Sequence, residues 1–317
     1  MSYKIDNQLA EQITRLQPAL ASLPDFTPGN PLEWRNRANA LYRLINQQFP
    51  EYEGIRTQDI HLPLPDKQLM ARRYSPENRL TRGIVLYIHG GGGVAGSVSL
   101  YDKIVGNYVS QSRVEFLSLE YGLSPETSGL AQTEQVIAAL HWLRENSAQL
   151  DIDPSRIVLM GDSGGGGIVA SAALLALTHS ITLAGLVMVY PMLNHQVAEI
   201  TPELASLLSI STDEIETAWR ARLGNDVDKT ALPFVSPSAA TSLAGLPPTF
   251  IDVGELDLFC QACFDWASRS VAAGIPTEFH LYSGVNHGFE LLAPLSEKAR
   301  MAFELRSQAI QRMAGQA

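Results

Sequence analysis

Hydrophobic residues follow two different spacings along the chain, and the change between them divides it into segments. In residues 1–50 they recur at intervals of three or four, which predicts a helix, at Leu9, Ile13, Leu16 and Leu20. Asn30 followed by Pro31 is typical of a second helix start. Residues 55–75 alternate between polar and apolar instead, as expected of two antiparallel edge strands joined by a turn near Pro65 and Asp66.

From residue 82 onward, short runs rich in Val, Ile and Leu alternate with helical stretches. The expected strands are RGIVLYIHG, VEFLSLEYG, RIVLMGDSG and LAGLVMVYP, with helices near 100–112, 130–149 and 165–178 between them. Continuous apolar strands separated by helices predict an α/β fold, with a parallel sheet covered on both faces.

The alternation stops after Pro191 and resumes near residue 247. Segment 195–245 has helical pieces and loop signals without a convincing strand, so we interpret it as an insertion at the carboxyl edge of the sheet, over a ligand site. A strand (PPTFIDVGELD), a helix over about 259–273, a last strand (TEFHLYS) and a final helix complete the pattern.

Composition excludes several classes of protein. The net charge of −10 argues against nucleic acid and anionic membranes as partners. The 45% hydrophobic content supplies a large core and excludes general disorder. With two cysteines, no apolar leader and no apolar stretch longer than about 11 residues, we expect a cytoplasmic protein without membrane insertion.

Ser163 is the first candidate for chemistry. It lies in Gly161-Asp162-Ser163-Gly164-Gly165, between a predicted strand and a predicted helix. A serine flanked by glycines at such a turn matches the strained nucleophile elbow, in which the amide of Gly164 faces a developing oxyanion. The same letters surround the nucleophile of chymotrypsin-like proteases, but those proteases are all-β and their histidine precedes the serine.

A serine nucleophile needs a histidine base and a carboxylate that orients it. His287 follows the last predicted strand, in Ser283-Gly284-Val285-Asn286-His287-Gly288-Phe289, and it comes after the serine in chain order. The carboxylate is expected after the preceding strand, where Glu255 and Asp257 both lie in a loop. Asp257 is favoured, partly by the family resemblance given below. One helix and one strand separate Asp257 from His287, which returns the chain to the same edge of the sheet.

A glycine strip follows the first long strand, in His89-Gly90-Gly91-Gly92-Gly93-Val94-Ala95-Gly96. The amides of Gly91 and Gly92 can join that of Gly164 in an oxyanion hole. The letters also match a dinucleotide fingerprint at Gly91, Gly93 and Gly96, with Glu120 ending the next strand. The oxyanion interpretation is favoured because a helix does not open at the second glycine and because the fingerprint leaves Ser163, Asp257 and His287 unused.

Together these residues resemble the hormone-sensitive-lipase-like (family IV) microbial carboxylesterases, over roughly residues 70–315. The matching segments are ARRYSP, HGGGGVAGS, YGLSPE, DPSRIVLMGDSGGG, SPSAATSLAGLPP, GELD and VNHGF. The resemblance implies an α/β-hydrolase fold with a mostly parallel eight-stranded sheet. It also implies a cap built from residues 1–50 and 195–245 on a catalytic domain over 51–317, and activity on short-chain acyl esters. Under it, Ser163, Asp257 and His287 are catalytic, Gly91, Gly92 and Gly164 form the oxyanion hole, and no metal or cofactor is needed.

The chain departs from the family pattern at several positions around the site. The family's aromatic after the glycines is Gly93 here, its alanine after the nucleophile is Gly164, and its asparagine further on is Gly167. We hypothesise that loss of the aromatic at Gly93 removes a wall near the substrate and widens substrate tolerance. Cys260 and Cys263, in the helix after the acid loop, are interpreted as small buried residues because no second pair of metal ligands accompanies them.

Two alternative functions stay open at this point. A non-catalytic small-molecule binding protein can use the same fold, although the presence of His287 favours an enzyme. An amidase or peptidase can use the same three residues, because specificity for the leaving group depends on the cap. The resemblance also suggests a homodimer paired through the last strand.

Overall fold

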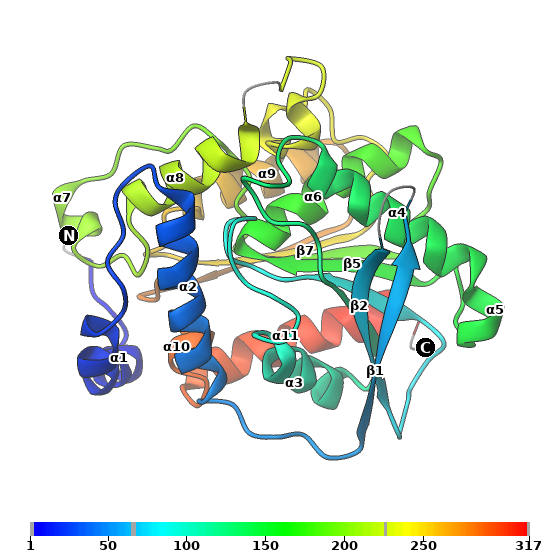
Figure 1. Cartoon of the computed structure of the whole chain (residues 1–317), viewed down its shortest axis with the longest axis horizontal. Helices are drawn as coiled ribbons and strands as arrows, with labels where there is room; N and C mark the ends of the chain where they lie inside the picture. The colour runs from blue at the N-terminus through cyan, green and yellow to red at the C-terminus, as the bar shows by residue number, and fades with distance from the viewer. Residues whose placement is uncertain (1–2, 65–67, 225–226, 316–317) are drawn as a thin grey trace.

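A computed structural model describes residues 3–64, 68–224 and 227–315. The chain forms one eight-stranded sheet with helices on both faces, and the two ends of the chain lie on opposite sides of the view (Figure 1). The predicted α/β-hydrolase fold is thus confirmed. The predicted turn at Pro65 and Asp66 lies outside the described residues.

The sheet order is β1-β2-β4-β3-β5-β6-β7-β8, and β1 and β2 are antiparallel to their neighbours while the other strands run parallel. The strands span Ile55–Pro63 (β1), Gln68–Pro76 (β2), Ile84–Ile88 (β3), Glu115–Leu119 (β4), Ile157–Asp162 (β5), Gly185–Val189 (β6), Thr249–Gly254 (β7) and Thr277–Tyr282 (β8). Strands β3 to β7 are buried along their whole length. That burial explains their continuous apolar runs, since helices cover both of their faces.

Helices form two layers around the sheet (Figure 1). One face carries α3 (Asp102–Ser112) and α11 (Glu297–Met313), and the other carries α4 (Ala131–Glu145), α6 (Ser163–Thr178) and α9 (Cys260–Ala272). A short helix, α5 (Ser147–Leu150), follows α4, and another, α10 (Phe289–Leu292), precedes α11. Helix α6 is buried from Ser163 to Ala176, which suits a run of Gly, Ala, Val and Leu without a polar face.

The N-terminal segment and the insertion meet at one end of the molecule. In Figure 1, α7 (Pro202–Ala205) and α8 (Thr212–Leu223) lie above α1 (Asn7–Ala21) and α2 (Pro31–Asn46), and α2 packs against α8. The insertion also holds two 3₁₀ turns, Leu232–Phe234 and Pro237–Ala239, and no strand in its described part. Asn30 caps α2 by accepting hydrogen bonds from the amides of Leu32 and Glu33, as the Asn-Pro pair predicts.

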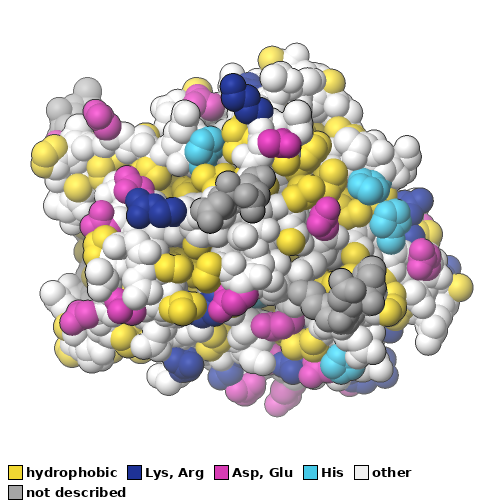
Figure 2. Space-filling view, turned by 45° about the horizontal axis from the view of Figure 1, so that its top comes forward, with side chains coloured by type: hydrophobic (Ala, Val, Ile, Leu, Met, Phe, Trp, Pro, Cys, Tyr) yellow, Lys and Arg dark blue, Asp and Glu magenta, His cyan; other side chains and the backbone are white. Residues whose placement is uncertain are grey.

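Acidic and basic side chains are mixed over the face of the molecule shown in Figure 2. In Figure 2, Lys and Arg side chains are scattered among Asp and Glu, with small hydrophobic areas between them. Within the described ranges, no helix combines the length and the apolar character needed to cross a bilayer.

Candidate active site

Ser163 lies at the junction of β5 and α6, with its backbone in the left-handed region at φ +53°. A non-glycine residue reaches that region only where its surroundings enforce it, and such strain is concentrated at functional sites. Here the turn between a buried strand and a buried helix enforces it, and the carbonyl of Ser163 accepts a hydrogen bond from the amide of Met192 at 2.9 Å. The strained elbow predicted from the glycines is therefore present.

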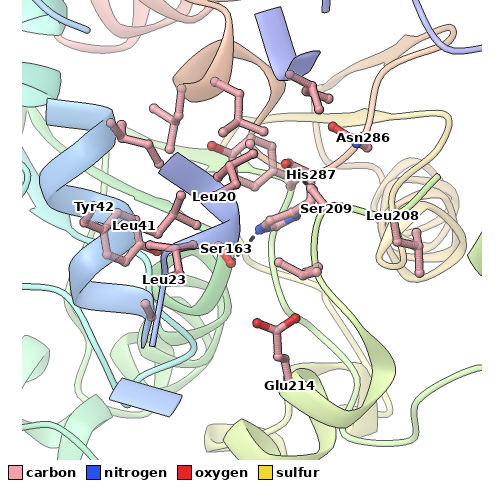
Figure 3. A pocket seen from close by; sticks show the side chains of 18 of the residues that line it. Leu20, Leu23, Leu41, Tyr42, Ser163, Leu208, Ser209, Glu214, Asn286 and His287 are labelled. Carbon is pink, nitrogen blue, oxygen red and sulfur yellow. Dashed lines mark hydrogen bonds between the residues drawn. The ribbon is translucent and has the colours of Figure 1, made fainter. Parts of the chain in front are cut away.

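Three residues that are far apart in the sequence meet at the carboxyl edge of the sheet. His287 Nε2 lies 2.9 Å from Ser163 Oγ (Figure 3). On the other side of the ring, His287 Nδ1 lies 2.7 Å from Asp257 Oδ2. Asp257 is almost fully buried, and its Oδ1 accepts a hydrogen bond from the amide of Phe259 at 2.9 Å. This arrangement suits a neutral imidazole that donates from Nδ1 to the carboxylate and accepts the serine proton at Nε2.

Glu255, the alternative carboxylate, has a different place. Its Oε2 accepts a hydrogen bond from the amide of Gly284 at 2.8 Å, in the loop that leads to His287. Glu255 thus holds the histidine loop, while the carboxylate of Asp257 contacts the imidazole itself.

The glycine strip packs directly against the serine turn. Gly91 and Gly92 have φ angles of +103° and +63°, and a Cβ placed on Gly164 would lie 2.5 Å from the backbone of Gly92. Among the backbone hydrogen bonds of the described residues, none uses the amide of Gly91 or Gly92 as donor. The structure thus brings the three glycines expected to form an oxyanion hole together beside Ser163.

The structure contradicts the hypothesis that the missing aromatic at Gly93 removes a wall of the cavity. Its φ is +74°, and a Cβ there would point at Arg222 Cδ and Gln132 Oε1, at 2.8 and 2.9 Å. Gly93 is not among the residues that line the cavity at Ser163. The space beyond Gly93 is filled by Arg222, so the lack of an aromatic there does not open a wall of the cavity.

A mostly apolar cavity of about 400 Å³ opens over Ser163 and His287. Its walls come largely from the N-terminal helices and the insertion, as Figure 3 shows for Leu20, Leu23, Leu41, Leu208 and Glu214. Sequence reasoning placed these segments near the site but did not identify individual residues, because their helical spacing alone does not tell a cavity wall from a packed core.

Asp162, next to the nucleophile, is a site residue that sequence reasoning missed. It is buried, and its carboxylate accepts hydrogen bonds from the hydroxyls of Tyr87 at 2.5 Å and Tyr101 at 3.1 Å. Burial raises the pKa of Asp162 to about 6, although the two tyrosine hydroxyls act in the opposite direction. A buried acidic residue inside the Gly-Asp-Ser-Gly-Gly turn was the signal that could have identified it.

His89, at the start of the glycine strip, is structural. Burial lowers the pKa of His89 to about 4, so its ring is neutral at physiological pH. The ring stacks on Tyr121 with centroids 4.4 Å apart, and the Tyr121 hydroxyl donates to the carbonyl of His89. These contacts fix the strand end from which the strip departs.

Cys260 and Cys263 agree with their interpretation as structural residues. Cys263 is buried and contacts the carbonyl of Pro191 through Sγ at 3.7 Å, and Cys260 is partly buried. Burial raises the pKa of both thiols, that of Cys260 to about 11.

Comparisons with known proteins identify the family of the chain. Residues 85–291 match a protein family described as alpha/beta hydrolase fold. The chain is 32% identical over 228 residues to carboxylesterase NlhH of Mycobacterium tuberculosis, covering 68% of this chain and 70% of the relative. It is 28% identical over 272 residues to an arylesterase of Saccharolobus solfataricus, covering 85% of this chain and 87% of the relative.

Solved structures resemble the whole chain. A bacterial heroin esterase superposes with a TM-score of 0.85 at 26% identity, covering 99% of both chains. An esterase from Pyrobaculum calidifontis has the same TM-score and identity and covers 98% of this chain and 99% of the other. The chain therefore belongs to the alpha/beta hydrolase family, and within it to the hormone-sensitive-lipase-like (family IV) carboxylesterases.

Proposed function

We propose that this protein is a serine carboxylesterase that hydrolyses short-chain acyl esters with Ser163 as nucleophile, His287 as base and Asp257 as the residue that orients it. The observation that carries the proposal is the pair of contacts from His287, 2.9 Å to Ser163 Oγ and 2.7 Å to Asp257 Oδ2, at the base of an apolar cavity.

The reaction follows from these contacts. As the hydroxyl of Ser163 attacks the ester carbonyl, its proton moves to His287 Nε2, and the resulting imidazolium is stabilised by Asp257. The carbonyl oxygen becomes an oxyanion that the amides of Gly91, Gly92 and Gly164 stabilise. His287 then protonates the departing alcohol, and water, activated by the same histidine, releases the acid from the acyl-enzyme.

The N-terminal helices and the insertion act as one cap in this proposal. Both supply apolar side chains to the cavity, including Leu41 from α2 and Ile210 from the loop before α8. A cavity of about 400 Å³ is near the lower end of ligand pockets, which supports short acyl chains rather than long lipids. We accordingly place the cap at residues 1–50 and about 195–245, and the catalytic domain in the remainder of 51–317.

A series of p-nitrophenyl esters with two to twelve acyl carbons, given to wild-type protein and to Ser163→Ala, tests the proposal. We expect hydrolysis that is fastest with short chains and that falls by at least about a thousandfold in the variant. A fluorophosphonate probe should label wild-type protein at Ser163. Absence of both hydrolysis and labelling in folded protein would favour the binding-protein alternative, and faster cleavage of matched anilides than of esters would favour an amidase.

We also propose that two copies of the chain pair through β8. Within the described residues, this strand is at one edge of the sheet and pairs with β7 alone. Leu281 in β8 is about half exposed, as are Phe264 and Val271 in the adjacent helix α9. Light scattering of wild-type protein and of Leu281→Lys tests this: a dimer that the substitution dissociates supports the pairing, and a monomeric wild type contradicts it.

A further inference from the structure

A fully buried cluster of charged side chains lies behind the candidate active site. Arg306 of α11 donates from Nε to Asp252 Oδ2 at 2.6 Å and from Nη1 to Glu290 Oε1 at 2.7 Å. Asp252 belongs to β7, and Glu290 belongs to α10, three residues after His287. All three side chains are almost completely shielded from solvent. We call them the buried ion cluster.

The buried ion cluster contains more acidic groups than basic groups. Two carboxylates face one guanidinium, and Glu290 Oε2 has no hydrogen-bond partner within the described residues. A buried ion pair is weak evidence for a stabilising role, because desolvation offsets most of the attraction between the charges. Stability alone therefore does not explain the cluster, and its contacts with neighbouring residues are the better guide to its role.

Tyr190 connects the cluster to the catalytic histidine. Its hydroxyl donates to Glu290 Oε1 at 2.6 Å, and its ring centroid lies 4.4 Å from that of His287. The backbone of Tyr190 has a φ of +33°, an uncommon conformation for a residue with a Cβ. The ring reaches the histidine because the chain turns in this way at the end of β6.

We propose that Tyr190, held by its hydrogen bond to Glu290 in the buried ion cluster, is a positioning residue that fixes the ring of His287 between Ser163 and Asp257. This inference rests on the proposed function. Asp257 holds one edge of the imidazole through Nδ1, but a single hydrogen bond leaves the ring free to rock about it. The rings of Tyr190 and Phe259 restrict that motion, since Phe259 meets the imidazole edge-on at 5.1 Å.

The hydroxyl of Tyr190 is suited to a fixed role. Burial raises the pKa of Tyr190 well above its usual value, so the group is a neutral donor throughout the working pH range. A short hydrogen bond from a neutral phenol to a carboxylate is among the stronger hydrogen bonds in proteins. Arg306 in turn donates to the same oxygen of Glu290, which fixes the position of the carboxylate that accepts from Tyr190.

Tyr190→Phe removes only this hydrogen bond, and Tyr108→Phe is its matched control. The Tyr108 hydroxyl accepts a hydrogen bond from Arg306 Nη1 at 3.1 Å, and Tyr108 does not line the cavity. Both variants lose one buried hydrogen bond of the same cluster, so we expect similar falls in melting temperature. We expect kcat on p-nitrophenyl acetate to fall about tenfold in Tyr190→Phe with KM within about twofold, because small misplacements of catalytic groups are costly. Tyr108→Phe should keep kcat within about twofold.

A second pair of variants changes the acceptor. Gln at position 290 keeps a carbonyl that accepts from both Tyr190 and Arg306, so Glu290→Gln should keep kcat within about threefold. Glu290→Met removes the acceptor and leaves Arg306 with Asp252 as a balanced pair, so its kcat should fall as far as that of Tyr190→Phe.

The inference is overturned if Tyr190→Phe and Tyr108→Phe have the same kcat, or if Glu290→Gln loses as much activity as Glu290→Met. Failure of the proposed function is a separate result, because wild-type protein would then show no hydrolysis that depends on Ser163.

Discussion

Replacing Gly164 by alanine tests whether Gly91, Gly92 and Gly164 form the proposed oxyanion hole. Alanine is the family's usual residue at this position, so the resemblance alone suggests that Gly164→Ala is harmless. In this chain, however, the added Cβ would lie 2.5 Å from both the nitrogen and Cα of Gly92. Ordinary van der Waals contact begins near 3.4 Å, and the atoms in the way belong to backbone rather than to a flexible side chain. The strip must therefore move away from Ser163 by about 1 Å.

The size of the effect follows from that displacement. A 1 Å misplacement of a catalytic group costs about a hundredfold in rate, and loss of one oxyanion donor costs about 10²–10³ in kcat. We therefore expect kcat to fall about a hundredfold, equivalent to about 2.7 kcal/mol of transition-state stabilisation. The free energy of unfolding should change less. Overpacking costs about 1–3 kcal/mol, and the higher helix propensity of Ala over Gly offsets up to about 1 kcal/mol of that cost.

The assay is steady-state hydrolysis of p-nitrophenyl acetate, with melting temperature measured in parallel. Gly166→Ala is the control, since its Cβ would meet the Pro191 side chain at 2.9 Å instead of the glycine strip. It should overpack the same turn of α6 while keeping kcat within a few-fold. A Gly164→Ala enzyme with wild-type kcat would refute the reasoning and would show that the strip tolerates a side chain at this position.

Three further predictions follow from burial and shape. Because the folded protein raises the pKa of Asp162 to about 6, its carboxyl group stays protonated between about pH 4 and 6, where the unfolded chain has lost that proton, so this group lowers stability as pH rises through that range. The free energy of unfolding of Asp162→Asn, measured in urea, should therefore rise by about 3 kcal/mol relative to wild type between pH 4 and pH 7.5. A difference that stays constant with pH would contradict this. Ala38→Trp should fill part of the cavity and lower kcat/KM for p-nitrophenyl octanoate at least about tenfold more than for the acetate, whereas equal losses would place Ala38 away from the acyl chain. Iodoacetamide should modify neither Cys260 nor Cys263 in folded protein at pH 8, because burial raises the pKa of both thiols, and rapid labelling detected by mass spectrometry would contradict this.

The sequence was sufficient where the signal is local or topological. Strands β3 to β7 were predicted because strands covered on both faces read as unbroken apolar runs. Topology selected Ser163, His287 and the loop of Glu255 and Asp257, because the carboxyl ends of parallel strands converge at one edge. The choice of Asp257 over Glu255 rested partly on the family resemblance. The contacts of 2.9 and 2.7 Å at His287 agree with that selection.

The sequence was insufficient where side chains meet across layers. Arg306 in the last helix contacts Asp252 in β7, and nothing in the local pattern of either segment pairs them. Tyr190 read as the end of an apolar strand, because its contact with His287 depends on a backbone turn at φ +33°. The hypothesis for Gly93 failed for a related reason: with φ at +74°, a side chain at Gly93 would point at Arg222 and not into the cavity.

Helix α2 contacts both the cavity and the glycine strip of the proposed oxyanion hole. It lines the cavity with Leu41, and it also holds the carboxyl-terminal end of the glycine strip. Arg35 Nε donates to the carbonyl of Val94 at 2.6 Å, and Asn39 Oδ1 accepts from the amide of Gly96 at 2.8 Å. The strip has positive φ angles at Gly91 and its neighbours and few backbone hydrogen bonds of its own, so its position depends on such outside contacts. We therefore expect that a substrate which shifts α2 also shifts the proposed oxyanion donors, so that the proposed cap affects the chemical step as well as the choice of ester.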